Sequence, residues 1–164
     1  MKSKHIFGAL ILTLSFASIS RAQLPITVPK NQYGLEIIAS KGLYNAVVKD
    51  DSSLSLLSLT YCIPNIKLDL RYASKNNFMG HCMYPKFTEI TFLRMPAAYA
   101  LKQAEAELEQ KNMHFKVFDA YRPYSVTEKF WKEVHDERYV ANPAKGSGHN
   151  KGLADRKSTR LNSS

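Results

Sequence analysis

The segment 115–123 reads Phe-Lys-Val-Phe-Asp-Ala-Tyr-Arg-Pro, and it joins an apolar stretch to a group of polar side chains. Residues 115–120 are mostly apolar, which predicts a β-strand buried on both faces. Asp119 and Arg122 stand at the end of this strand, at the base of a loop that Pro123 stiffens. The forked, permanently charged donors of Arg122 suit a carboxylate or a developing oxyanion. From these residues alone, a structural Asp119–Arg122 ion pair is the favoured interpretation.

The sequence on either side of this strand predicts two helices and two more strands. Residues 66–72 alternate apolar and polar side chains, as strands do. Pro96 opens a helix whose apolar residues recur at helical spacing and which ends at Asn112. Ser125 caps a second helix, with Glu128 completing a capping box, and a glycine-rich segment then leads to another strand. This order of elements predicts an α+β fold.

A second chemical pattern follows, Ser147-x-His149-x-x-Gly152-x-Ala154. A neutral imidazole in a loop of small residues, just ahead of a strand, can bind zinc. A lone histidine is more often an ordinary surface or core residue, so the residues alone favour that simpler interpretation of His149.

The two ends of the chain differ from the part between them. Residues 1–22 combine a basic start, a short apolar run and small residues before position 23, which predicts a secretory signal peptide and export to the periplasm or medium. Its apolar run is too short to span a bilayer, and we expect no membrane span after cleavage. Residues 155–164 lack apolar periodicity and predict coil; they resemble a translated sequencing adapter, so we expect a non-native tail. Residues 23–58 form a weakly patterned lead-in, and 59–154 hold the predicted elements.

The charge of the chain says little about its partners. The 164 residues carry a formal charge of +9, which would suit an anionic polymer. Six of the 23 basic residues but only one of the 14 acidic ones lie in the two end segments, so the rest of the chain carries +4. The remaining basic residues are scattered, without a basic aromatic platform, which argues against nucleic-acid binding.

Four segments together carry a family resemblance: Asp-Leu-Arg-Tyr-Ala at 69–73, Asn-Asn-Phe-Met-Gly at 76–80, Phe-Asp-Ala-Tyr-Arg-Pro at 118–123 and the histidine pattern at 147–154. Their order resembles the zinc D-alanyl-D-alanine dipeptidases associated with vancomycin resistance and peptidoglycan turnover, over about residues 63–154. The resemblance implies an α+β, antiparallel-sheet metallopeptidase fold of the D-Ala-D-Ala peptidase type. It also implies one zinc ion and a small peptide substrate.

The resemblance implies a role for two residues. His149 matches the position of a zinc ligand, and Arg122 matches the arginine that stabilises the transition state. Zinc would polarise the scissile carbonyl and activate a water, while a fixed cation meets the oxyanion. The Asn76–Phe78 loop and Tyr121 would shape the pocket without a chemical role.

The sequence also departs from the family pattern. The aspartate ligand of the family is expected at the position of Arg156, and Asp155 stands one place early; in a strand, that slip turns a side chain to the opposite face. No Glu-x-x-His element follows to supply the general base and the third ligand. We therefore expect a domain incomplete at its C-terminus and a chain that is inactive as written.

The remaining candidate residues receive simpler interpretations. His81, His114 and His135 match no ligand position of the family and are interpreted as surface or loop residues. Cys62 and Cys82 lie in the part expected to be exported, where a disulfide and two free thiols are both open possibilities.

Three functions follow as alternatives. The first is zinc-dependent hydrolysis of the D-alanyl-D-alanine dipeptide by the full-length gene product. The second is a non-catalytic peptidoglycan-binding pseudo-enzyme that keeps the pocket without the metal. The third is a D,D-carboxypeptidase of the same fold that cuts longer stem peptides.

Overall fold

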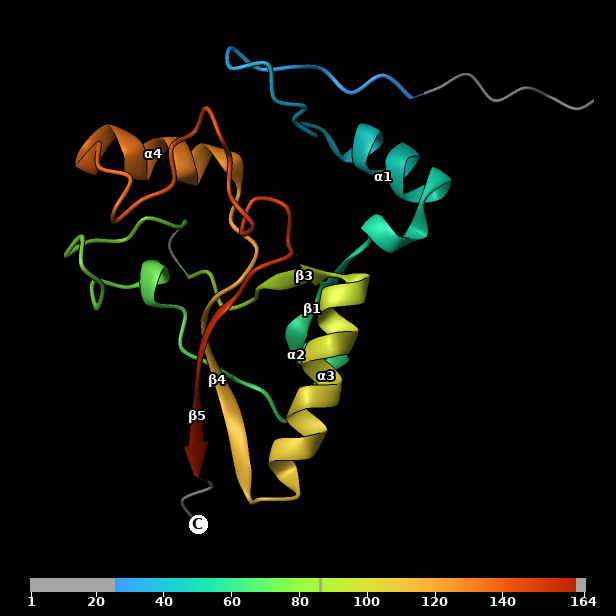
Figure 1. The fold of residues 1–164 in the computed structure, drawn as a ribbon, viewed down its shortest axis with the longest axis vertical. Helices are drawn as coiled ribbons and strands as arrows, with labels where there is room; N and C mark the ends of the chain where they lie inside the picture. The colour runs from blue at the N-terminus through green and yellow to red at the C-terminus, as the bar shows by residue number, and fades with distance from the viewer. Residues whose placement is uncertain (1–25, 86, 162–164) are drawn as a thin grey trace, which may run out of the picture.

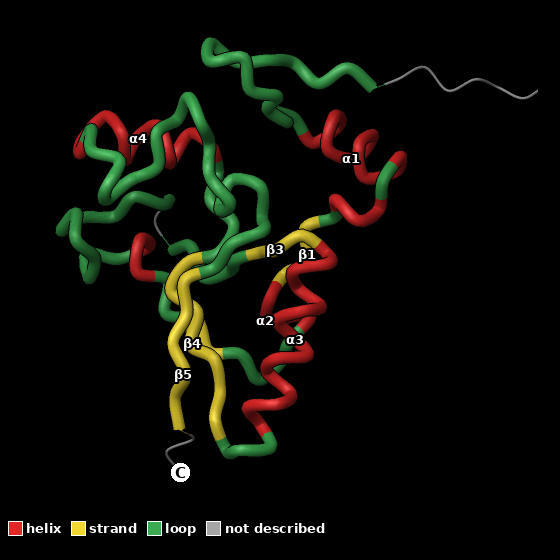
Figure 2. The backbone as a smooth tube through the Cα atoms, in the orientation of Figure 1, coloured by secondary structure: helices red, strands yellow, loops and turns green. Residues whose placement is uncertain are grey.

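The segment around Phe115 forms the middle strand of a sheet in the computed structural model, which describes residues 26–85 and 87–161. This strand is β4, Met113–Asp119. On one side it pairs in parallel with β2, Lys67–Leu68, and on the other it pairs antiparallel with β5, Arg156–Leu161. Figure 2 shows β4 and β5 running side by side. The predicted signal peptide lies outside the described residues.

A second, two-stranded sheet and a long helix complete one half of the fold. Strand β1, Leu56–Ser58, pairs antiparallel with β3, Phe92–Arg94, and the short helix α2, Leu59–Cys62, follows β1 directly. Helix α3, Met95–Glu109, begins with Pro in its first turn, as predicted, and packs beside β4 (Figure 1). The apolar side chains between these elements form a first core, made of Leu59, Cys62, Ile63, Ile66, Leu93, Ala98, Leu101, Val117 and Ala120.

The other half of the fold is built around α4, Tyr124–Val134. Its apolar face packs on the loop that follows β2, and the 3-10 turn η2, Arg71–Ala73, belongs to that loop. This second core consists of Tyr72, Met83, Tyr84, Val126, Phe130 and Val140. Together the two halves confirm the α+β class. No described helix is long and apolar enough to cross a bilayer.

The lead-in contains structure that the sequence pattern did not indicate. Helix α1, Lys41–Asp50, begins after Ser40, whose Oγ accepts a hydrogen bond from the Leu43 N–H at 3.2 Å. A 3-10 turn, η1, Ser52–Leu54, then leads into β1. The Leu56 N–H donates to the Tyr44 hydroxyl at 2.8 Å, which ties α1 to β1.

Three predicted elements need correction. The strand expected at 66–72 is only β2, because the chain turns into η2 directly afterwards. β4 is less buried than predicted, since only Val117 and Asp119 within it are buried. The capping box at Ser125 is wrong: α4 begins two residues earlier than predicted, at Tyr124, with Pro123 at the N-cap and no side-chain hydrogen bond capping the helix.

The coil expected at 155–164 is also wrong for residues 156–161, which form β5. The backbone of this segment pairs with β4 in the register Lys116–Ser158. Main-chain pairing needs no apolar side chain, and polar residues suit an edge strand that faces water. Whether the tail is native stays a prediction.

Candidate functional site

Asp119 and Arg122 form a buried ion pair where β4 ends. Their side chains are joined at 2.5 Å between Oδ2 and Nη2, with Asp119 only 1% exposed and Arg122 8% exposed. The Arg122 guanidinium also lies over two aromatic rings, at 4.8 Å from the Phe130 centroid and 5.3 Å from that of Tyr72. Cations over aromatic faces are attracted by the ring quadrupole, more strongly where water is excluded. Arg122 is therefore fixed by charge on one side and by aromatic rings on the other.

Tyr84 completes this buried network. Its hydroxyl donates a short hydrogen bond to Oδ1 of Asp119, so both carboxylate oxygens are engaged. Burial, the charge of Asp119 and this hydrogen bond together raise the pKa of Tyr84 far above its usual value. Burial opposes the charge on Arg122, but the Asp119 carboxylate more than offsets it, and the pKa of Arg122 is raised. The network thus holds a neutral phenol, a carboxylate and a guanidinium away from bulk water.

The loop that carries His149 docks onto this strand end. Main-chain hydrogen bonds join the Gly152 N–H to the His149 carbonyl at 3.1 Å and the Arg122 N–H to the same carbonyl at 3.0 Å. The Asn150 amide donates to the Arg122 carbonyl at 2.9 Å and to Thr127 Oγ1 at 2.8 Å. The structure therefore brings together the two residues that the sequence singled out, Arg122 and His149.

Gly152 allows the loop to sit this close. Its φ is +65°, and a Cβ added there would lie 2.9 Å from Leu56 Cδ2 and 3.2 Å from the Arg94 backbone nitrogen. The Arg94 N–H also donates to the Gly152 carbonyl at 2.8 Å. Only glycine combines this backbone conformation with so close an approach to β3.

The orientation of the His149 ring leaves one nitrogen available. Nδ1 lies 2.7 Å from the Ala120 carbonyl oxygen, which can only accept a hydrogen bond. Nδ1 therefore carries the proton of the neutral ring, and Nε2 keeps its lone pair. A hydrogen bond from the second nitrogen to a backbone carbonyl is the usual support of a metal-binding histidine.

The described residues around His149 supply a single metal ligand, however. Asp119 Oδ2 lies 3.7 Å from Nδ1, but Arg122 and Tyr84 already occupy its oxygens. Asp155 precedes β5, and its carboxylate pairs with Lys157 Nζ at 2.6 Å, while Arg156 is exposed. Among the described residues, the one group of three possible ligands is elsewhere and does not include His149. The orientation of His149 fits zinc, whereas the described ligand set is incomplete.

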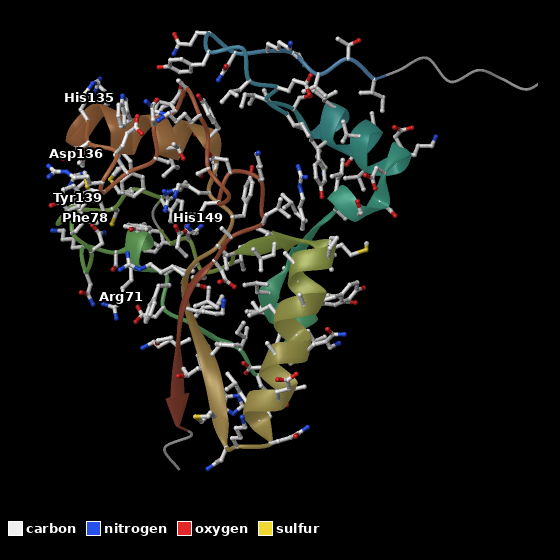
Figure 3. All side chains as sticks on the ribbon, in the orientation of Figure 1. Arg71, Phe78, His135, Asp136, Tyr139 and His149 are labelled. Carbon is white, nitrogen blue, oxygen red and sulfur yellow. The ribbon has the colours of Figure 1, made fainter. Side chains whose placement is uncertain are left out.

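A cavity of about 670 Å³ opens next to the buried network. Its lining combines cations, amides and aromatic rings: Arg71, Tyr72, Asn76, Asn77, Phe78, Phe118, Arg138, Tyr139 and Arg156. The predicted loop 76–78 thus shapes a pocket, whereas Tyr121 is not among its lining residues. Figure 3 shows Arg71, Phe78 and Tyr139 on the same side of the molecule.

The cationic side chains of this cavity are positioned by neighbours. Arg71 pairs with Asp69 at 3.0 Å and lies over the Phe118 ring, 4.8 Å from its centroid. The Asn77 amide donates to the Arg71 carbonyl at 3.1 Å and so holds the loop against η2. Among the described residues, the lining contains arginines and aromatic rings but no carboxylate, while Asp69 and Asp136 pair with Arg71 and Arg138 from outside it.

Comparison with known proteins shows which family carries these motifs. The sequence profile described as D-ala-D-ala dipeptidase, of peptidase family M15, matches residues 52–163. The chain belongs to the D-ala-D-ala dipeptidase family. It is also similar to the D-alanyl-D-alanine dipeptidase of Escherichia coli K12, with 27% identity over 99 residues. That match covers 60% of this chain and 50% of the relative, so the chain spans about half the length of the curated relative it matches.

Family membership confirms the predicted resemblance and its peptidase fold class, and the structure adds residues that the sequence did not indicate. Tyr84 lies 35 positions before Asp119, so no local pattern could have linked the two. Asn150 lies inside the histidine pattern of the family segment, but at a position that the pattern leaves open.

The structure also tests the interpretations of the three other candidate histidines and of the two cysteines. His81 and His135 are exposed, as expected. The interpretation of His114 as a surface or loop residue is wrong, because it lies in β4 with a side chain only 12% exposed and bonds to Glu105. Cys62 and Cys82 are both free thiols.

Proposed function

We propose that the full-length product of this gene, a member of the D-ala-D-ala dipeptidase family, catalyses the zinc-dependent hydrolysis of the D-alanyl-D-alanine dipeptide in peptidoglycan metabolism. The supporting observation is the buried Arg122, held beside His149 by Asp119 and by main-chain hydrogen bonds. The relative of similar sequence is named for the same dipeptidase activity. Because the predicted signal peptide implies export, the reaction is proposed to occur in the periplasm or outside the cell.

Arg122 is suited to stabilise an oxyanion. Its Nη2 is committed to Asp119, while its buried Nε has no hydrogen-bond partner among the described residues. A buried donor without a partner carries a free-energy penalty that a ligand oxygen would relieve. Because the guanidinium is already fixed, it would meet a developing negative charge without reorganisation.

His149 is suited to hold zinc through Nε2. Its Nδ1 donates to the Ala120 carbonyl, which fixes the ring and leaves the Nε2 lone pair available. Bound zinc would polarise the scissile carbonyl and activate a water. The described residues near His149 supply no further ligand, so we expect the 164-residue chain alone to show no turnover.

The adjacent cavity supports a peptide substrate with a free carboxylate. Arg71, Arg138 and Arg156 line the cavity, and guanidinium donors suit a carboxylate. Asp69 engages Nη2 of Arg71, and Asp136 engages Nε and Nη2 of Arg138, so the remaining donors would bind the substrate. The dipeptide D-Ala-D-Ala carries one carboxylate and is far smaller than the cavity of about 670 Å³. The spare volume supports a second candidate, a D,D-carboxypeptidase of the same fold that takes longer stem peptides.

Binding and turnover should be measured separately on the purified chain. We expect saturable calorimetric binding of D-Ala-D-Ala, with L-Ala-L-Ala as the stereochemical control and Arg71→Gln as a variant that weakens it. A stem pentapeptide that binds more tightly than the dipeptide would favour the carboxypeptidase. Binding without release of D-alanine would fit a peptidoglycan-binding pseudo-enzyme, and release with stoichiometric zinc would overturn the expected inactivity. Absence of binding by both peptides would refute the proposed function.

A further inference from the structure

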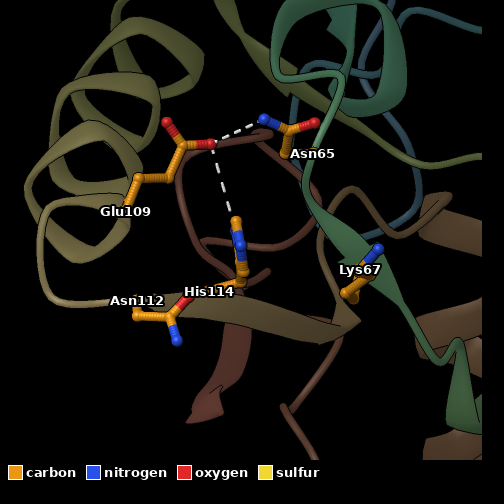
Figure 4. A pocket seen from close by; sticks show the side chains of 5 residues that line it. All are labelled: Asn65, Lys67, Glu109, Asn112 and His114. Atoms are coloured by element: carbon orange, nitrogen blue, oxygen red, sulfur yellow. Dashed lines mark hydrogen bonds and ion pairs between the residues drawn. The ribbon is translucent and has the colours of Figure 1, made fainter. Parts of the chain in front are cut away.

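Two carboxylates and an imidazole converge where α3 gives way to β4, away from Arg122 and His149. Glu105 and Glu109 lie one helical turn apart and so share a face of α3. The chain then reverses through Asn112, whose φ of +54° lies in the left-handed region, and His114 is the second residue of β4. This reversal places the His114 ring against both glutamates. Figure 4 shows Glu109 and His114 facing one another.

Glu105 is buried, and each of its two oxygens meets one neighbour on β4. It is 1% exposed, and its oxygens meet His114 Nδ1 at 2.8 Å and the Phe115 N–H at 2.8 Å. Glu109 Oε1 lies 3.9 Å from the same His114 nitrogen. The ion-pair contacts of both carboxylates, within the described part of the chain, thus converge on one ring nitrogen. Buried charges in proteins are normally paired or bound to a metal, and here one imidazole faces a buried carboxylate and an exposed one.

The three side chains are spaced for a single ion. One ligand atom from each, an oxygen of Glu105, an oxygen of Glu109 and a nitrogen of His114, lies within 4.8 Å of the other two. Ligands of a zinc ion stand about 2.0–2.2 Å from it, so two of them are at most about 4.4 Å apart. Closing the site therefore needs only a small movement, which the partly exposed Glu109 can make.

The cluster is open to solvent on one side. A cavity of about 370 Å³ is lined by Asn65, Lys67, Glu109, Asn112 and His114 (Figure 4). The Asn65 amide donates to Glu109 Oε1 at 2.8 Å and orients that carboxylate. The open side leaves room for water to complete the coordination of an ion.

We propose that Glu105, Glu109 and His114 form a binding site for one divalent transition-metal ion that links the end of α3 to the start of β4. The imidazole favours zinc, cobalt or nickel over magnesium and calcium, which prefer all-oxygen sites. An ion bound only by the folded chain stabilises that state according to its concentration and affinity. The site needs neither the dipeptide nor His149, so it does not rest on the proposed function.

The test uses Co²⁺ as a spectroscopic probe and Zn²⁺ as a competitor, on the metal-free full chain. We expect the chain with His149→Ala to bind one Co²⁺ with visible d–d bands, to release it to Zn²⁺, and to melt at higher temperature with Zn²⁺. Glu109→Gln keeps the shape and the amide contacts, and should weaken binding by more than about 10-fold. Glu107→Gln, an exposed glutamate of the same helix, is the matched control and should bind normally.

Lys67 gives a test of the opposite sign. Its ammonium lines the same cavity, so Lys67→Gln removes a competing cation and should tighten Co²⁺ binding. Variants of Glu105 or His114 could fail to fold. Glu109→Gln and Lys67→Gln still test the proposal in that case, because both change exposed side chains and should leave the fold intact. Unchanged Co²⁺ binding in Glu109→Gln, or binding that disappears with His149→Ala alone, would overturn the proposal.

Discussion

The Nδ1 atom of His149 lies 2.7 Å from the carbonyl oxygen of Ala120, the residue that follows β4. This contact crosses 29 positions of sequence and joins the histidine loop to the strand that leads to Arg122. It determines which nitrogen of the ring is free, and with it the direction in which a metal could approach.

The tautomer of His149 can be observed directly. At pH 8, where an ordinary imidazole is neutral, we expect the long-range ¹H–¹⁵N spectrum to show a proton on Nδ1 and none on Nε2. His149→Gln identifies the signal by removing it. Added Zn²⁺ should shift the Nε2 resonance, and a proton found on Nε2 instead would contradict the assigned orientation.

The buried pair of Asp119 and Arg122 should matter far more to stability than a surface pair. Asp119→Ala leaves a buried guanidinium without its partner, and we expect the free energy of unfolding to fall by about 3–5 kcal/mol. Asp136→Ala breaks the Asp136–Arg138 pair, whose Arg138 side chain is exposed, and should lower the free energy of unfolding far less. Urea unfolding followed by circular dichroism measures both, and similar losses in the two variants would contradict the inferred burial.

Tyr84 should make the fold sensitive to alkali. Its pKa is raised above the ordinary value of about 10 because burial and Asp119 disfavour the phenolate. A raised pKa in the folded state stabilises the fold below pH 10, and this stabilisation is lost as the pH rises further. Melting temperatures from pH 8 to 11 should therefore fall more steeply for the wild type than for Tyr84→Phe, whereas parallel curves would argue against a buried phenol.

Gly152 and Gly80 separate backbone conformation from crowding. Both have positive φ, +65° and +71°, but a Cβ at Gly80 would meet nothing within 4 Å. Gly80→Ala should lower the free energy of unfolding by about 1–2 kcal/mol, because alanine is strained in the left-handed conformation. Gly152→Ala should lose a further 1–3 kcal/mol, roughly, because the new methyl overlaps Leu56 and the β3 backbone. Equal losses of unfolding free energy in the two variants, measured by denaturant unfolding, would show that the loop moves to accommodate the methyl group at position 152.

The spacing of apolar residues along the sequence predicted those elements that pack one face against the first core. The 3-to-4 spacing after Pro96 predicted α3, and the apolar run around Val117 predicted β4. Both patterns arise because the apolar side chains of these elements pack into the core. The alternation at 66–72 overestimated β2, since the Asn77 amide bonds to the Arg71 carbonyl and favours a turn there. β5 gave no pattern at all, because its pairing involves the main chain rather than apolar side chains.

The candidate site was predictable only where the family motifs carry it. The motifs singled out Arg122 and His149, and the structure places the two side by side, while their roles stay a prediction. Tyr84 and His114 were missed because their partners, Asp119 and Glu105, become neighbours only after the chain folds back. Long-range contacts of this kind leave no trace in local spacing.

The hydrogen bond between the Arg122 N–H and the His149 carbonyl is made by main-chain atoms alone. This bond would survive any replacement of Arg122 other than proline, because neither side chain takes part in it. Side chains hold the loop as well, since the Asn150 amide bonds to the Arg122 carbonyl and the His149 ring to the Ala120 carbonyl. Exchange of the residues at positions 122 and 149 would therefore weaken the docking of the loop without removing all of it.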